Sequence, residues 1–126
     1  MLQNITQEQC LELLEKVRWS GVPKCSYCGS INSTHIKKEN RYHCNECFNS
    51  YSVTVNTLFH KTHVDLPRWF TAICLVLKSQ NKVTVLELAA RIQVNKNTAS
   101  YMIARIRKAM VEEPELIQKL LGHNIC

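Results

Sequence analysis

The stretch CSYCGS at residues 25–30 is followed by YHCNECF at residues 42–48, so two Cys-x-x-Cys pairs lie fifteen residues apart. This spacing is typical of a four-thiolate zinc site. Zinc takes four ligands at the corners of a tetrahedron, and two short turns can each supply two sulfurs. The pattern therefore predicts that one structural Zn²⁺ is held by Cys25, Cys28, Cys44 and Cys47, with no open position for water.

Other uses of these thiols fit the sequence less well. A redox centre needs one Cys-x-x-Cys beside a strand–helix unit, whereas here two pairs stand among short, strand-like segments. The N-terminus does not read as a signal peptide, so we expect the chain to stay in a reducing cytoplasm, where a disulfide framework does not suit its seven cysteines. Iron could also bind four thiolates, but zinc ranks above it. Cys10 and Cys74 lie on apolar helical stretches and are expected in the core, and Cys126 is expected to be a free thiol.

Helical periodicity flanks the cysteine-rich part. Apolar spacing predicts helices over about 6–18, 66–79, 85–92 and 96–110 and a short one from Pro114, with Thr6, Asp65, Thr84 and Asn95 as N-caps. Between them, YSVTV at residues 51–55 alternates like a half-buried strand.

The expected fold class is α+β, mainly α. It consists of a small four-cysteine zinc ribbon followed by a helix-turn-helix three-helix bundle, with an amphipathic helix at the N-terminus. The predicted limits are 1–20 for the N-terminal helix, 21–60 for the ribbon, 61–112 for the helix-turn-helix and 113–126 for a short helix and tail.

A helix-turn-helix is predicted by LELAARIQVNKNTASYMIARIRKAM at residues 86–110. Ala89 and Ala90 are small where the second helix crosses the first, and Val94 gives the turn an apolar residue facing the core. The buried face of the second helix is expected to hold Ala99, Ile103, Ile106 and Met110, with Met102 at its edge.

The opposite face of that helix is polar and basic, as a helix in the major groove of DNA requires. Asparagine can pair with adenine, and lysine or arginine with guanine or phosphate. The candidate DNA-binding residues are Lys96, Asn97, Ser100, Tyr101, Arg105, Arg107 and Lys108, with Lys61 and Arg68 ahead of them. A plain helical hairpin with a solvated face is the alternative, and Gln93, where glycine is common, favours it.

The distribution of charge favours a polyanionic partner. The chain carries a formal net charge of +6, and between Lys16 and Lys108 it has fifteen Lys and Arg but only four Asp and Glu. The other acids lie near the two ends. A basic body of this kind suits nucleic acid, although a solvated basic surface explains the charge alone equally well.

With both motifs placed, the sequence resembles the N-terminal region of zinc-ribbon insertion-sequence transposases, in which a zinc ribbon and a helix-turn-helix precede a DDE-type catalytic domain. The matching stretches are RW at residues 18–19, CSYCGS, RYHCNEC, YSVTVNTLFHKTHVDLPRWFTAICLVL at residues 51–77, LAARIQVNKNTA and RIRKAM. The departures are Ser26 and Tyr27 where proline is usual, Asn56 where glycine is usual, and Ser100 where an aromatic is usual.

The catalytic domain of that family has no counterpart here. Its chemistry needs several converging carboxylates, and Asp65 is the only aspartate in this sequence. We therefore expect a chain that is not an enzyme by itself, although assembly with a catalytic partner chain is another reading.

The expected function is sequence-specific binding of double-stranded DNA, as the end-binding part of a transposase or as a standalone regulator or accessory subunit. The second helix would dock in a major groove, with the ribbon and residues 59–63 holding phosphates nearby. The alternative is a zinc-ribbon adaptor that binds protein, through helix 6–18 or as a homodimer; RNA is a further alternative. We expect a prokaryotic cytoplasmic protein, associated with the nucleoid and not with a membrane.

Overall fold

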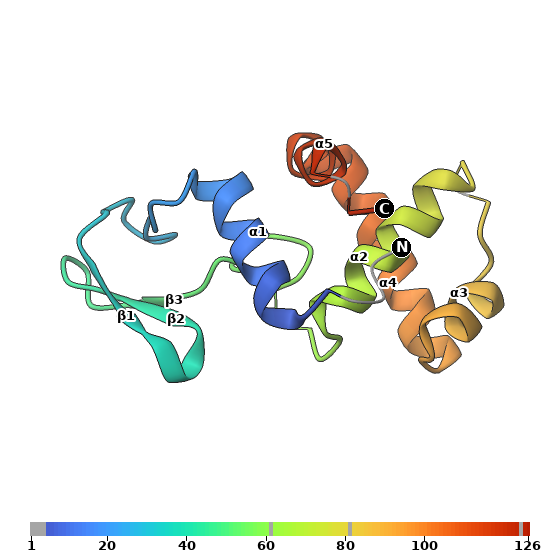
Figure 1. Ribbon diagram of the computed structural model, residues 1–126, viewed down its shortest axis with the longest axis horizontal. Coiled ribbons are helices and arrows are strands. Elements are labelled where there is room, and N and C mark those ends of the chain that lie inside the picture. The colour runs from blue at the N-terminus through green and yellow to red at the C-terminus, as the bar shows by residue number, and fades with distance from the viewer. Residues whose placement is uncertain (1–4, 61, 81, 124) are drawn as a thin grey trace.

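The computed structural model describes residues 5–60, 62–80, 82–123 and 125–126, and it has a small sheet at one end and a helical body at the other (Figure 1). The sheet is antiparallel, in the order β1-β2-β3. Its strands are β1 (Ser33–Ile36), β2 (Arg41–Cys44) and β3 (Ser50–Tyr51), with the 3₁₀ turn η1 (Lys37–Glu39) at the tip of the β1–β2 hairpin. The helices are α1 (Gln7–Trp19), α2 (Leu66–Lys78), α3 (Val85–Ile92), α4 (Lys96–Glu112) and α5 (Pro114–Gly122).

Side-chain caps begin three of these helices as the sequence predicted. Thr6 accepts a hydrogen bond from the Gln9 N–H at 3.1 Å, and the Gln9 side chain accepts one from the Thr6 N–H at 2.9 Å. Thr84 caps α3 through the Glu87 N–H at 3.1 Å, and Asn95 caps α4 through the Thr98 N–H at 2.7 Å. Each cap satisfies a backbone donor that the first turn of a helix leaves unpaired.

The start of α2 differs from the prediction. Asp65 occupies the N-cap position, but its side chain makes no capping bond. Its carboxylate instead lies 2.7 Å from Arg68 Nη1, and the first N–H of α2, at Leu66, donates to the Gln7 side-chain oxygen at 2.6 Å. The cap therefore comes from α1, fifty-nine residues earlier in the chain.

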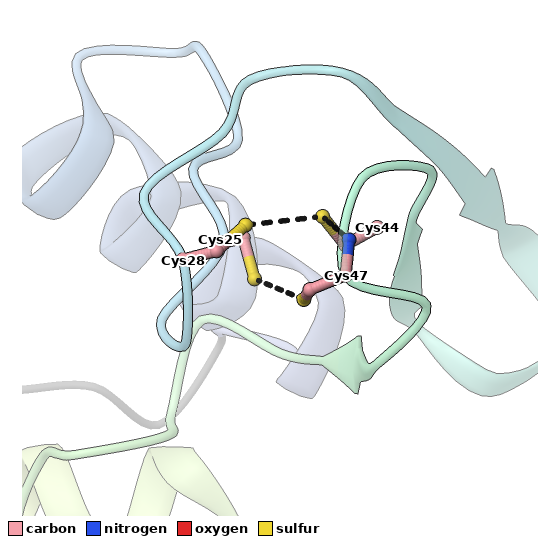
Figure 2. A group of neighbouring side chains, drawn as sticks. All are labelled: Cys25, Cys28, Cys44 and Cys47. Carbon is pink, nitrogen blue, oxygen red and sulfur yellow. Dashed lines mark hydrogen bonds between the residues drawn. The ribbon is translucent and has the colours of Figure 1, made fainter.

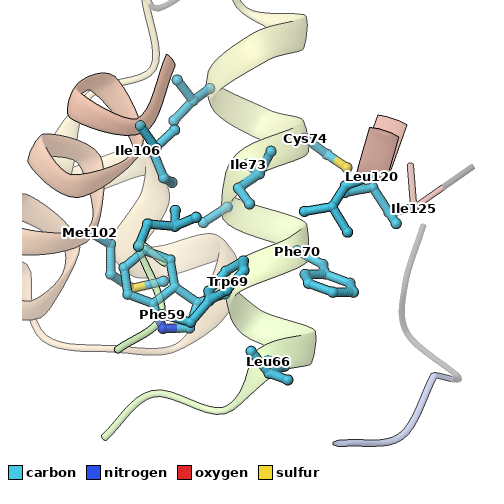
Figure 3. Close-up of a cluster of buried hydrophobic side chains, with 14 of the residues drawn as sticks. Phe59, Leu66, Trp69, Phe70, Ile73, Cys74, Met102, Ile106, Leu120 and Ile125 are labelled. Atoms are coloured by element: carbon cyan, nitrogen blue, oxygen red, sulfur yellow. The ribbon is translucent and has the colours of Figure 1, made fainter. Parts of the chain in front are cut away.

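Most of the apolar interior lies in the helical body (Figure 3). Trp69, Phe70 and Ile73 of α2 are fully buried, so the prediction that α2 is a core helix is confirmed. Helix α1 belongs to the same core, because Cys10 and Leu14 on its apolar face are fully buried and the helix packs against α2 and α5.

A second, smaller cluster joins the sheet to α1. Trp19 meets the rings of Tyr42 and Tyr51 edge-on, with 5.7 Å between centroids in each case. The Tyr42 hydroxyl donates to Glu15 of α1 at 2.8 Å. Burial is the main cause that raises the pKa of Tyr42 well above its usual range, and the hydrogen bond to Glu15 is the next. The phenol therefore stays protonated and keeps its hydrogen bond.

The strand predicted over residues 51–55 is wrong beyond Tyr51, since β3 ends there and the chain turns. The alternation arises from packing, because Val53 and Val55 are buried although they are not in a strand. Arg18 Nη1 donates to the Val53 carbonyl at 2.9 Å, and Thr57 N–H bonds back to Thr54 at 3.1 Å. Alternating burial along a segment therefore does not require that the segment pair with a neighbouring strand.

The expectation that Cys126 is a free thiol is also wrong. Cys126 forms a disulfide with Cys74 of α2, with a Cα–Cα distance of 5.6 Å. The end of the chain folds back on the helical body, and Ile125 is 1 % exposed. Cys74 and Cys126 lie 52 residues apart, and no local pattern in the sequence predicts that these two segments meet. Among the described residues, none of the helices has the length and apolar character needed to cross a bilayer.

Candidate metal centre and nucleic-acid interface

The four predicted zinc ligands lie together at the end of the sheet (Figure 2). Their sulfur atoms are all within 4.8 Å of one another, with 3.6 Å between Cys25 and Cys47 and 3.5 Å between Cys28 and Cys44. Zn–S bonds of ~2.3 Å place the sulfurs of a regular tetrahedron about 3.8 Å apart. The donor set and its spacing fit one zinc ion, and four thiolates leave no open position, so the site is structural.

The two cysteine turns have the same backbone design. In the first, Gly29 N–H donates to the Cys25 carbonyl at 2.9 Å, and in the second Phe48 N–H donates to the Cys44 carbonyl at 3.0 Å. Both residues adopt the left-handed conformation, with φ of 80° at Gly29 and 64° at Phe48. Glycine adopts it freely, whereas a bulky residue does so under strain. The rigid turns hold each pair of sulfurs on one side of the site.

Hydrogen bonds tune the thiols before metal binds. The backbone N–H and side-chain amide of Asn49 lower the pKa of Cys47 to about 6. The Ser30 N–H lowers the pKa of Cys28, but the neighbouring thiols, Cys44 first, outweigh it and raise that pKa to about 12. Thiols must lose their protons to bind zinc, so zinc binding weakens as the pH falls.

Helices α3 and α4 are joined by a three-residue turn at residues 93–95. Gln93 takes a left-handed conformation, with φ of 59°, which explains why glycine is common there. The face of α4 toward the core holds Ala99, Met102, Ile103, Ile106 and Ala109. This largely confirms the predicted stripe, although Met102 is fully buried and not at the edge, and Met110 is only half-buried.

The outer face of α4 carries most of the candidate DNA-binding residues. Tyr101 is 39 % exposed and packs edge-on against Trp69 at 6.4 Å. Lys108 lies 4.0 Å from Glu112, one turn further along. The remaining candidates on this face are all exposed: Lys96, Asn97, Ser100 and Arg107.

Arg105 and Arg68, two of the candidate residues, donate to backbone carbonyls. Arg105 donates through Nε and Nη2 to the Leu58 carbonyl at 3.0 and 2.6 Å, and Nη2 also lies 3.4 Å from the Thr57 and 3.2 Å from the His60 carbonyl. Arg68 donates to the Ile92 carbonyl at 2.8 Å and pairs with Asp65. Lys61, the remaining candidate, lies outside the described residues.

Sequence reasoning missed part of this surface. An open groove lies between residues 62–65 and the α3–α4 turn, and its walls include His63, Gln93 and Thr98 beside Arg68 and Tyr101. Thr98 could have been found from the sequence, because it follows the candidate Asn97 in the first turn of α4. The groove itself depends on how the segment before α2 packs on α4.

The apolar face of α1 is not open to a partner. Cys10, Leu14 and Val17 are all buried within the chain. A protein that binds α1 would therefore meet its polar face, where Glu8 and Glu12 are exposed.

Comparison with known proteins agrees with the geometry of the ribbon. Residues 5–50 match the family model of the transposase zinc-ribbon domain. The chain is also 25 % identical over 109 residues to an uncharacterized protein in transposable element ISH50 from Halobacterium salinarum, an alignment that covers 84 % of this chain and 36 % of that relative. No solved structure matches the chain. The N-terminal part of the chain, including all four clustered cysteines, is therefore similar to a transposase zinc-ribbon domain.

Proposed function

We propose that the chain is a zinc-stabilised module that binds double-stranded DNA in a sequence-specific manner. The observation that carries this proposal is the outer face of α4, which presents exposed Lys96 and Asn97 at its start, directly after a three-residue turn from α3. A helix that reads the major groove contacts base edges through the residues of its N-terminal turns. Asn97 would pair with adenine and Lys96 with guanine or phosphate.

The role we propose is recognition of transposon ends, or regulation or targeting by a standalone copy. The transposase-type ribbon and the transposable-element relative support it. We propose no strand-transfer chemistry for these residues, since the four cysteines are the only metal-binding cluster among the described residues. A DNA reader of this kind would act in a prokaryotic cytoplasm, associated with the nucleoid.

The test is selection of bound duplexes from a random-sequence DNA pool by the zinc-loaded protein, followed by a salt titration on the recovered sequence. We expect one motif and an affinity that falls steeply with salt, because phosphate contacts release counterions. Asn97→Ala should weaken binding to the motif by about 1–3 kcal/mol and relax one base position. Gln118→Ala, which removes an exposed amide from α5, is the matched control and should bind like the wild type.

A protein adaptor is the second candidate, and exposed aromatic side chains on the cysteine turns favour it. Tyr27 is 58 % and Phe48 73 % exposed, and Phe48 is held in a left-handed conformation that strains it. Exposed aromatic residues often anchor protein interfaces. Recovery of no DNA motif, with binding to a partner protein that is insensitive to salt, would replace the DNA proposal with this one.

A further inference from the structure

The zinc ribbon presents a basic tip, far from α4 in the sequence. Lys37 and Lys38 in η1 and Arg41 at the start of β2 are all exposed. Glu39 lies among them, 3.9 Å from Arg41. Residues 37–41, the hairpin tip, thus carry three basic side chains and one acidic side chain, so the tip has a net positive charge.

The hairpin tip and the start of α4 lie on the same edge of the molecule, and α5 lies on the opposite edge (Figure 1). Between them runs the linker, residues 53–65. An open groove of about 560 Å³ separates the hairpin tip from the linker, and one of about 490 Å³ separates the linker from the α3–α4 turn. Both grooves have Thr62 in their walls. The edge is therefore a row of three ridges: hairpin tip, linker and turn.

Polar donors line this edge. Arg41, Asn40 and His60 line the first groove, and Asn95 and Thr98 the second. Asp65, in the second groove, is paired with Arg68 at 2.7 Å. These side chains are typical of contacts to a nucleic-acid backbone. The first groove is also lined by Glu39 and by apolar side chains such as Leu11, Phe59 and Leu66, so its polar side chains alone point to such a contact.

The linker is fixed to the helical body, and the sheet is joined to α1 by the hydrogen bond from Tyr42 to Glu15. Arg18 of α1 holds the Val53 carbonyl, and Arg105 of α4 holds the Leu58 carbonyl. Further along, Trp69 Nε1 donates to the Thr62 hydroxyl at 3.1 Å. These bonds come from three different helices, so the linker does not act as a loose tether.

We propose that the hairpin tip is a second contact to the duplex that α4 reads, in which Lys37, Lys38 and Arg41 bind backbone phosphates on one flank of the recognised sequence. This inference rests on the proposed function and specifies its partner, which is a duplex that extends beyond the base pairs read by α4. A duplex is a stiff rod, so a rigid edge can contact it at two separated places. The flank contact adds affinity and orientation but reads no bases.

The test compares Lys37→Ala/Lys38→Ala with a control that removes the same charge elsewhere. Lys16 of α1 and Lys119 of α5 are exposed, and Lys16→Ala/Lys119→Ala is that control. Both zinc-loaded proteins are titrated with salt on the selected duplex and on duplexes trimmed on either flank. Loss of two phosphate contacts should reduce the slope of log affinity against log salt by about 2, because each contact contributes ~0.9.

We expect the wild type and the control to lose affinity when one particular flank is trimmed. The hairpin-tip variant, which keeps only Arg41 of the three contacts, should lose much less. Equal salt slopes for the two double variants, or a wild type insensitive to trimming of both flanks, would overturn the second contact. The Asn97→Ala variant separates the two proposals. If it weakens binding while the hairpin-tip variant does not, only this inference fails; if neither weakens binding, the proposed function fails as well.

Discussion

Single residues in this chain have functions that their chemistry alone does not reveal. Arg105 is a basic residue on the polar face of a helix, which is the description of a DNA contact. In the folded chain its guanidinium donates to backbone carbonyls of residues 57, 58 and 60, so it also has a structural role. Buried or half-buried carbonyls need donors, and arginine can serve several of them from one planar group.

Replacing Arg105 with alanine should therefore lower the stability of the protein. We expect the free energy of unfolding to fall by about 1–3 kcal/mol, because the linker carbonyls lose a charged donor. Lysine at this position should restore little, since it lacks the planar fork. Urea unfolding of the zinc-loaded protein measures the effect. Lys108→Ala, which breaks only an exposed ion pair on the same helix, is the control and should cost less than about 1 kcal/mol. An Arg105→Ala protein of unchanged stability with much weaker DNA binding would show that Arg105 acts as a DNA contact and not as a structural donor.

At the scale of elements, local sequence determines where most helices start. Thr6, Thr84 and Asn95 were predicted as caps and all three accept the expected backbone hydrogen bond. Asp65 fails as a cap because a nearby arginine competes for its carboxylate and Gln7 reaches the free N–H from another helix. A cap is predictable when its partners lie within three residues, and unpredictable when distant residues offer better ones.

Asn95 and Asn97, two residues apart, should separate folding from binding. Asn95→Ala removes the bond to the Thr98 N–H and should cost about 1 kcal/mol of stability, within a range of about 0.5–2. Asn97→Ala alters an exposed side chain and should change stability by less than about 0.5 kcal/mol. Thermal unfolding of the two variants in parallel measures the difference. Equal losses from both would mean that the Asn95 side chain does not cap α4.

The described residues form two apolar interiors of unequal size, with Trp19 packed against both. The large one includes α1 and the helices after the linker, and the small one consists of Cys25, Tyr42, Cys44 and Tyr51, with Trp19 against it. The small cluster holds few side chains, so we expect it to depend on the metal, as small zinc domains do. The large cluster has no metal ligand and should fold without zinc.

The two tryptophans should report these interiors independently when zinc is removed. Trp19 packs against the ribbon and also touches the edge of the large interior, whereas Trp69 is fully buried in the helical body. In a Trp69→Phe protein, a chelator should shift the fluorescence of Trp19 to longer wavelength, because that ring becomes exposed. In a Trp19→Phe protein, the fluorescence of Trp69 should stay unchanged and most of the helical circular dichroism should remain. Simultaneous loss of both signals would show that the two interiors fold as one unit.

The sequence by itself determined the metal centre, the starts of most helices and the buried face of α4. These features depend on spacing within a few residues: two Cys-x-x-Cys turns, a cap and its N–H partner, and apolar residues on one helical face. The tertiary structure alone decided the disulfide between Cys74 and Cys126, the carbonyls that Arg105 contacts and the helices against which α1 packs. Each of these features joins segments that lie far apart in the chain. The packing of the whole interior determines which distant segments meet, and no local pattern in the sequence contains that information.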